Sequence, residues 1–104
     1  MIEYDATIVE MTSGELGRKF KKFMEEHTQY DGDVDVQFER DDGEIMVMVG
    51  VDMTEDQLES LEEAGIDVNI PQAMGYDLLC GIYGKDPDLY PGDSEDEIKI
   101  IIPK

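Results

Sequence analysis

The residues of this 104-residue chain best suited to chemistry are carboxylates, and their densest run is "DGDVDVQFERDD" at positions 31–42. The first three Asp residues of the run match the first three ligand positions of an EF-hand calcium loop. However, Val36 stands where that loop needs Gly, and Asp42 stands where it needs a bidentate Glu. We therefore expect no calcium loop here, no dedicated metal site and no cofactor.

Nucleophilic catalysis has few candidate groups in this sequence. Its one Cys, Cys80, and its one His, His27, would form a dyad only if the fold brought them together. His27 lies at helical spacing from Phe20 and Phe23, which predicts a packed helix face, and Cys80 within "LLCGI" predicts a small buried hydrophobe. Neither a Gly-rich phosphate loop nor a Ser nucleophile elbow is present. We expect a protein that is not an enzyme.

The net charge of −19, from 27 acidic and 8 basic residues, points to the class of partner. Nucleic acid and anionic membranes would repel such a surface, whereas a strongly basic protein surface would attract it. One Cys excludes an intrachain disulfide and fits a reducing compartment. With no basic leader and no apolar run near ~20 residues, we expect a cytoplasmic location without a signal peptide or membrane span.

The elements that would position these carboxylates begin at a motif that occurs twice, "VEMTSGEL" (9–16) and "VDMTEDQL" (51–58). In each copy a Thr can cap a helix, and an acid or amide three residues later closes a capping box. The Met before the Thr packs on the following Leu as a hydrophobic staple. The parts are Thr12, Glu15, Met11 and Leu16 in the first copy, and Thr54, Gln57, Met53 and Leu58 in the second.

A strand–helix–strand pattern surrounds each copy of the motif. The predicted helices cover 13–27 and 55–64, and Asp42-Gly43 predicts a tight hairpin. The predicted strands are 2–9, 33–40, 44–51 and 66–70. The pattern over residues 2–70 resembles the ferredoxin-like βαββαβ sandwich, an α+β fold. That resemblance implies one four-stranded sheet with both helices on one face, and it implies no particular function.

Residues 71–104 lie outside the repeat and are expected to form an extension of one overall domain whose core is residues 1–70. The segment is rich in Gly, Pro and Tyr, which predicts a structured loop with one helical turn near 72–80. "EIKIII" at 97–102 predicts a fifth strand that covers an open sheet edge or pairs with a second chain.

Alternation along the predicted strands separates a core face from an outer face. The side chains expected to face the helices are Ile2, Tyr4, Ala6, Ile8, Val34, Val36, Phe38, Ile45, Val47, Val49, Val51, Ile66, Val68 and Ile70. Leu16, Phe20, Phe23, His27, Leu58 and Leu61 would oppose them from the helices. The outer face would carry Glu3, Asp5, Thr7, Asp33, Asp35, Gln37, Glu39, Asp67 and Asn69, with Met46 and Met48 at its centre.

This acidic outer face carries the functional hypothesis. Regularly spaced carboxylates on a rigid sheet can imitate a nucleic-acid backbone, so we expect a small inhibitor that binds a basic, nucleic-acid-binding protein by DNA mimicry. A phage anti-CRISPR or anti-restriction protein in the host cytoplasm would act in this way. The expected partner-binding residues are Glu3, Asp5, Asp33, Asp35, Glu39, Asp67, Met46 and Met48, with Glu55, Asp56, Glu59, Glu62 and Glu63 of the second helix.

Two alternatives give the acidity a different meaning. The chain could be a regulatory or ligand-binding module of ferredoxin-like fold that forms a homodimer through an edge strand, with its charge serving solubility. The charge could also be an adaptation to high salt, in which case structure would be lost at low salt and recovered in molar salt.

Overall fold

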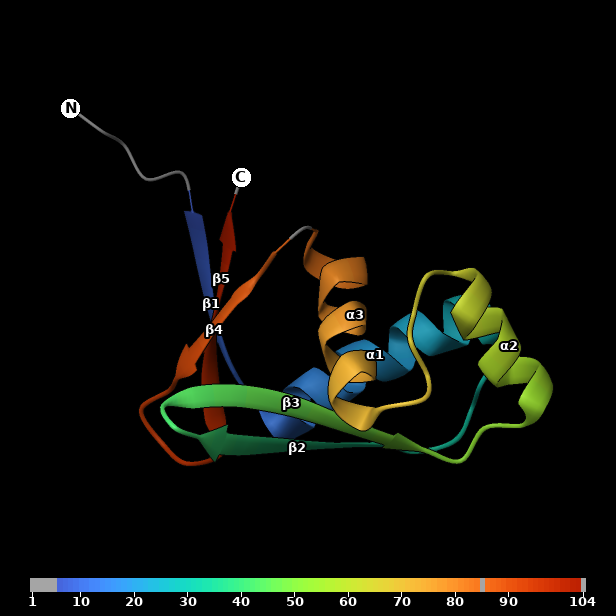
Figure 1. Ribbon diagram of the computed structural model, residues 1–104, viewed down its shortest axis with the longest axis horizontal. Helices are drawn as coiled ribbons and strands as arrows, with labels where there is room; N and C mark the ends of the chain where they lie inside the picture. The colour runs from blue at the N-terminus through green and yellow to red at the C-terminus, as the bar shows by residue number, and fades with distance from the viewer. Residues whose placement is uncertain (1–5, 85, 104) are drawn as a thin grey trace.

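The computed structural model describes residues 6–84 and 86–103, and over these residues the chain is an α+β fold with three helices and two antiparallel sheets (Figure 1). In chain order the elements are β1 (Ala6–Thr12), α1 (Ser13–Thr28), β2 (Val34–Asp41), β3 (Glu44–Val51), α2 (Glu55–Glu63), α3 (Pro71–Tyr83), β4 (Asp88–Pro91) and β5 (Glu97–Pro103).

Strands β2 and β3 form the predicted hairpin. Asp41 pairs with Glu44, so the loop is the two residues Asp42 and Gly43, with φ angles of 50° and 81°. Positive φ at both central residues is the requirement of a type I′ turn, and Asp-Gly meets it with little strain. The hairpin prediction is confirmed.

Both predicted capping boxes are also present. The Thr12 hydroxyl accepts from the Glu15 backbone N–H, and the Thr54 hydroxyl accepts from the Gln57 N–H, each at 3.2 Å. The Glu15 and Gln57 side chains accept the backbone N–H groups of their respective Thr residues in return. The repeated motif is therefore the corner that turns a strand into a helix.

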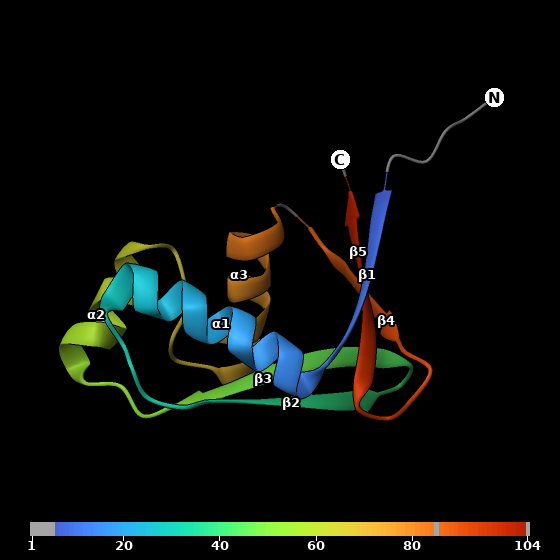
Figure 2. The same ribbon diagram turned by 180° about the vertical axis from the view of Figure 1, so that it is seen from behind.

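Strand β1 pairs with β5 and not with the hairpin. β5 is the central strand of a second sheet in the order β1-β5-β4, and all its neighbours are antiparallel. Helices α1 and α3 lie on one side of the hairpin, and the three-stranded sheet stands at its turn end (Figures 1 and 2). The single four-stranded sheet of a ferredoxin-like sandwich is therefore not confirmed.

The prediction of a strand at 66–70 was wrong. The Asp67 carboxylate accepts from the Asn69 backbone N–H at 2.9 Å, which closes a local turn, and the Asp67 N–H donates to the Asp77 carboxylate. Asp and Asn side chains often compete in this way with sheet hydrogen bonds. Pro71 then begins α3, and Ile70, expected in the core, is 55% exposed.

Helix α3 extends far beyond the single turn predicted near 72–80. Its buried residues Met74, Leu78 and Leu79 join the core, and Gly75 lies against the Val47 carbonyl of β3. Gly inside a helix costs about 1 kcal/mol relative to Ala, so the sequence signal for this helix was weak. Packing on β3 compensates for that local preference. The short strand β4, predicted as loop, is held by its pairing with β5.

The core-facing side of β1 is the opposite of the predicted one. Met11 is buried and Val9 is partly buried, whereas Ile8 is 64% exposed. Met11 faces inward because it must meet Leu16 at the start of α1, and alternation then carries Val9 to the same side. Ile2 and Tyr4 lie outside the described residues.

One side chain of the predicted helical layer is also misplaced. His27 is exposed near the end of α1, where its ring stacks on that of Phe23 with centroids 4.2 Å apart. Leu16, Phe20 and Leu61 are fully buried as expected.

One hydrophobic cluster joins both ends of the chain. Leu16 and Phe20 of α1 belong to the same core as Leu78 of α3 and Ile98 and Ile100 of β5. The inward strand residues of the hairpin, Val36, Ile45, Val47 and Val49, complete it as alternation predicted.

Candidate functional site

The outer side of the β2–β3 hairpin is left uncovered by the other elements that the structure describes. Both views show α1, α3 and the three-stranded sheet on the opposite side of the hairpin (Figures 1 and 2). Side chains of alternate residues point to this side. We define the acidic face as Asp35, Gln37, Glu39 and Asp41 of β2 with Glu44, Met46, Met48 and Gly50 of β3.

Carboxylates surround two methionines on the acidic face. Asp35 and Glu39 are exposed, and Glu39 pairs directly with Met46 across the hairpin. Gln37 pairs with Met48 and reaches toward the Asp35 carboxylate at 3.5 Å. The two Met side chains are half-buried, so the face offers polarizable apolar surface among its charges.

Two acids of this face were absent from the predicted site. Asp41 and Glu44 are exposed and directly opposite each other beside the turn. Like charges facing each other across a hairpin destabilise it. Their positions share the alternation of Asp35, Glu39 and Met46, so the sequence did contain the signal that would have identified them.

Asp33 lies just before β2, and its position is set by a neighbouring aromatic residue. The buried Tyr30 hydroxyl donates to the Asp33 carbonyl at 2.7 Å and accepts the Asp52 N–H at 3.2 Å. This bridge ties the start of β2 to the chain that leaves β3. The Asp33 side chain stays exposed at the end of the hairpin that leads to α2.

All five predicted acids of α2 are exposed: Glu55, Asp56, Glu59, Glu62 and Glu63. Glu55 and Asp56 lie in the first turn, where the helix dipole favours negative charge. Glu62 and Glu63 lie in the last turn, which holds no basic residue, so the dipole disfavours them there. The helix therefore keeps acidic groups that its own stability does not favour.

The remaining predicted site residues do not join this surface. Asp67 lies in the turn before α3, where its carboxylate binds Asn69, and not on a sheet face. Glu3 and Asp5 fall outside the described residues. Thr7 and Asn69 are exposed but belong to β1 and to that same turn.

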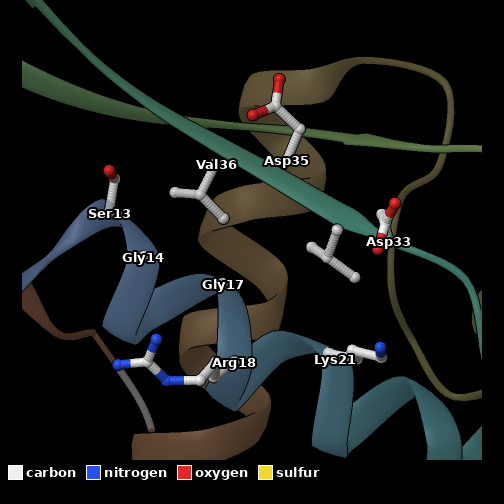
Figure 3. A pocket seen from close by; sticks show the side chains of 9 residues that line it. Ser13, Gly14, Gly17, Arg18, Lys21, Asp33, Asp35 and Val36 are labelled. Atoms are coloured by element: carbon white, nitrogen blue, oxygen red, sulfur yellow. The ribbon is translucent and has the colours of Figure 1, made fainter.

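A charged cleft of about 450 Å³ runs between α1 and the open edge of β2 (Figure 3). Arg18 and Lys21 line it from α1, Asp33 and Asp35 line it from the β2 side, and Gly17 lies in its floor. Asp35 points away from the helix in this view. The cleft places two of the eight basic residues of the chain beside the acidic face.

The carboxylates of the acidic face are not neutralised by a described cation. Within the described residues the one ion pair closer than 4.0 Å joins Lys99 of β5 to Asp93 of the β4–β5 loop, at 3.8 Å. Arg40 instead donates to the Ser94 carbonyl at 3.5 Å. The acidic face can therefore offer its charge to another molecule.

The described residues also bear on metal sites and membrane spans. No three His, Cys, Asp or Glu side chains come together there as a metal ion would require. None of the helices described is long and apolar enough to cross a membrane.

Comparison with known proteins supplies no relative: the chain matches no protein family, no curated protein and no solved structure. Its function therefore has to be argued from the arrangement of its own side chains.

Proposed function

We propose that this protein is a small, non-enzymatic inhibitor that occupies the nucleic-acid-binding surface of a basic protein by DNA mimicry. The proposed setting is the cytoplasm of a host cell, with a phage anti-CRISPR or anti-restriction role. The observation that carries the proposal is the acidic face, a hydrogen-bonded strand pair that no other described element covers and whose carboxylates no described cation neutralises.

The spacing of these charges suits a groove built for a nucleic-acid backbone. Alternate residues on a β-strand recur about every 6.8 Å, which is close to the rise of two nucleotides of one DNA strand along the helix axis. One row of carboxylates runs along β2 and consists of Asp33, Asp35 and Glu39. Two further carboxylates, of Asp41 and Glu44, extend this row to the turn. The α2 acids extend it beyond the other end of the hairpin.

The mechanism follows from electrostatics. A net charge of −19 steers the protein toward a Lys- and Arg-lined groove, where its carboxylates replace phosphates and exclude nucleic acid. Met46 and Met48 add flexible apolar side chains, which can adapt to the surface of the partner as carboxylates alone could not. Because long-range attraction is screened by salt, association should slow as ionic strength rises.

The test is competition for a DNA-binding protein. A fluorescent DNA duplex is bound to an RNA-guided nuclease complex or to a restriction enzyme, and its displacement by this protein is followed by anisotropy. We expect displacement that weakens between about 50 and 300 mM NaCl. The variant Asp33→Asn/Asp35→Asn/Glu39→Gln should compete at least roughly tenfold less well.

A matched control separates site from total charge. Glu25→Gln/Glu26→Gln/Glu95→Gln removes three exposed acids of α1 and the β4–β5 loop, none of which belongs to the acidic face, and it should compete nearly as well as the wild type. Equal losses in the two variants would mean that bulk charge, and not this face, binds. Competition that is flat with salt and survives the first variant would refute the proposal.

One observation favours the alternative of a dimeric regulatory or ligand-binding module. In the described chain β2 pairs only with β3, so its other edge is open beside the charged cleft. Strand addition at that edge would give a homodimer, although it would bring two copies of a −19 charge together. A dimer in sedimentation equilibrium at low salt would favour this function, and a monomer there would argue against it.

A further inference from the structure

An apolar trough lies between the hairpin, α3 and β4, on the side of β3 that β2 does not cover. It has a volume of about 370 Å³ and is lined mainly by Ile45, Met46, Ile70, Ala73, Tyr76 and Leu89. A second hollow adjoins it and shares Ile45, Tyr76 and Leu89. The trough is therefore continuous with the turn end of the hairpin.

The trough holds apolar surface that the fold does not bury. Ile70 is 55% exposed and Tyr76 is 42% exposed, while Tyr90, at 50%, lines the adjoining hollow. Large apolar side chains gathered in a hollow mark an interaction site more often than the same residues scattered singly. Aromatic side chains are the usual anchors of such contacts.

The backbone beside the trough is also suited to binding an extended chain. Within the described residues β3 pairs only with β2, and β4 pairs only with β5. In a hairpin closed by a two-residue turn, Ile45 belongs to a pair whose N–H and C=O groups point away from the partner strand. An added strand could use these groups, as in recognition by β-augmentation.

The charge around the trough selects the occupant. Glu44 and Asp88 line the adjoining hollow, and none of the described residues lining either hollow is Lys or Arg. A second copy of this chain would bring another −19 charge to the site and is disfavoured. An extended segment with Lys or Arg on either side of an apolar residue complements both the trough and its rim.

We propose that the trough binds an apolar side chain from a Lys- and Arg-rich extended segment of the basic partner. The proposal rests on the proposed function, because the same partner would meet the acidic face, and Met46 belongs to both surfaces. The acidic face then attracts basic proteins and raises the rate of association. The trough selects among those proteins. Burial of the apolar anchor is insensitive to salt, unlike the attraction of the carboxylates.

The test uses two short synthetic peptides of Lys and Arg residues. One carries an Ile and a Phe two positions apart, and the other has Ser at both places. We expect the apolar peptide to bind roughly tenfold more tightly by calorimetry, and this ratio should persist as salt lowers both affinities. Amide chemical shifts should change at Ile45, Ala73 and Leu89 with the apolar peptide.

Two variants locate the effect. Ile70→Ser/Tyr76→Ser removes exposed side chains of the trough. It should reduce the affinity of the apolar peptide to that of the Ser peptide. Ile8→Ser removes an Ile of β1 that is 64% exposed and lies outside the trough, and it should leave the ratio unchanged. Circular dichroism verifies that both variants fold.

Each other outcome overturns the proposal. If the two peptides bind equally and both weaken in salt, the trough is not a site, while the proposed function stands. If the apolar peptide binds more tightly but the trough variant does not reduce it, its anchor lies elsewhere. If neither peptide binds at low salt, the trough and the charge-based function fail together.

Discussion

Gly75 is the residue through which α3 reaches the sheet. A Cβ atom at this position would overlap the Val47 carbonyl oxygen, which belongs to the β3 backbone and cannot rotate aside. The helix therefore approaches β3 as closely as it does only because residue 75 has no side chain.

We predict that Gly75→Ala lowers the free energy of unfolding by about 2 kcal/mol or more, although Ala is the better helix former. Urea denaturation followed by circular dichroism measures it. Gly50→Ala is the control, because a Cβ there meets nothing closer than the Asp35 Cβ at 3.9 Å. A stability of Gly75→Ala equal to that of the wild type would show that α3 does not press on β3.

Tyr83, at the end of α3, links stability to high pH. Burial raises the pKa of its hydroxyl above the ordinary value of 10.0, so the folded state holds this proton more tightly than the unfolded chain does. The associated stability is present below about pH 10 and is lost as pH rises through the folded-state pKa.

In Tyr83→Phe there is no proton to lose, so we predict a smaller fall in stability between about pH 8 and pH 11 than in the wild type. Urea midpoints at the two pH values measure it. At about pH 8 the two proteins should be similar, since among the described residues the hydroxyl makes just one weak contact, at 3.9 Å with the Met11 sulfur. Parallel curves for the two proteins would exclude a role for this residue.

At the scale of elements, the repeated strand-to-helix corner is a local device that works wherever it occurs. We predict that Thr12→Ala and Thr54→Ala each lower the free energy of unfolding by about 1 kcal/mol. Thr12→Ser and Thr54→Ser keep the hydroxyl acceptor and should recover most of the loss. Chemical denaturation of the four variants tests this, and a loss in the Ser variants as large as in the Ala variants would argue against the caps.

The same corner explains the error in the predicted core-facing side of β1. Val49 and Val51 share the inward face of β3, and Met53 follows just beyond the end of that strand. The equivalent Met11 and Val9 share the inward face of β1. The prediction instead placed the row that contains Ile8 in the core. The alternation of one strand does not show which of its two apolar rows faces the helix. The hydrophobic staple decides which row faces inward, because Met11 must meet Leu16. The repeated motif contained this information.

At the scale of the whole molecule, the charge of −19 acts on the fold as well as on partners. Like charges in a compact chain repel, and salt screens that repulsion. We predict that the melting temperature rises by several degrees between about 10 and 150 mM NaCl. Thermal unfolding followed by circular dichroism measures it.

A charge-reduced variant gives the control for this salt response. Changing the five α2 acids to their amides should raise the melting temperature at low salt and make it less dependent on salt. A response of the same size in both proteins would mean that salt acts through something other than self-repulsion. Loss of structure at low salt that only molar salt restores would instead favour adaptation to high salt.

The sequence by itself determined the hairpin, the two capped helices, the inward row of β3 and the acidic row of β2. These features depend on neighbours in the chain: Asp42-Gly43 accepts positive φ, a Thr caps the helix that follows it, and alternation sorts a strand whose one face is apolar. The exposed Asp33, Asp35 and Glu39 were predictable for the same reason.

Only the tertiary structure decided the partner of β1, the fate of residues 66–70, the length of α3 and the existence of the trough. β1 pairs with β5 because Ile98 and Ile100 lie across from Met11 and Val9 and bury the same face with them. The turn at Asp67 is closed locally by Asn69, but its Asp67 N–H also donates to the Asp77 carboxylate of α3. Gly75 likewise meets the Val47 carbonyl of β3, which is distant in the chain. Which of these contacts forms depends on how much apolar surface the whole core buries. Local sequence patterns do not contain that information.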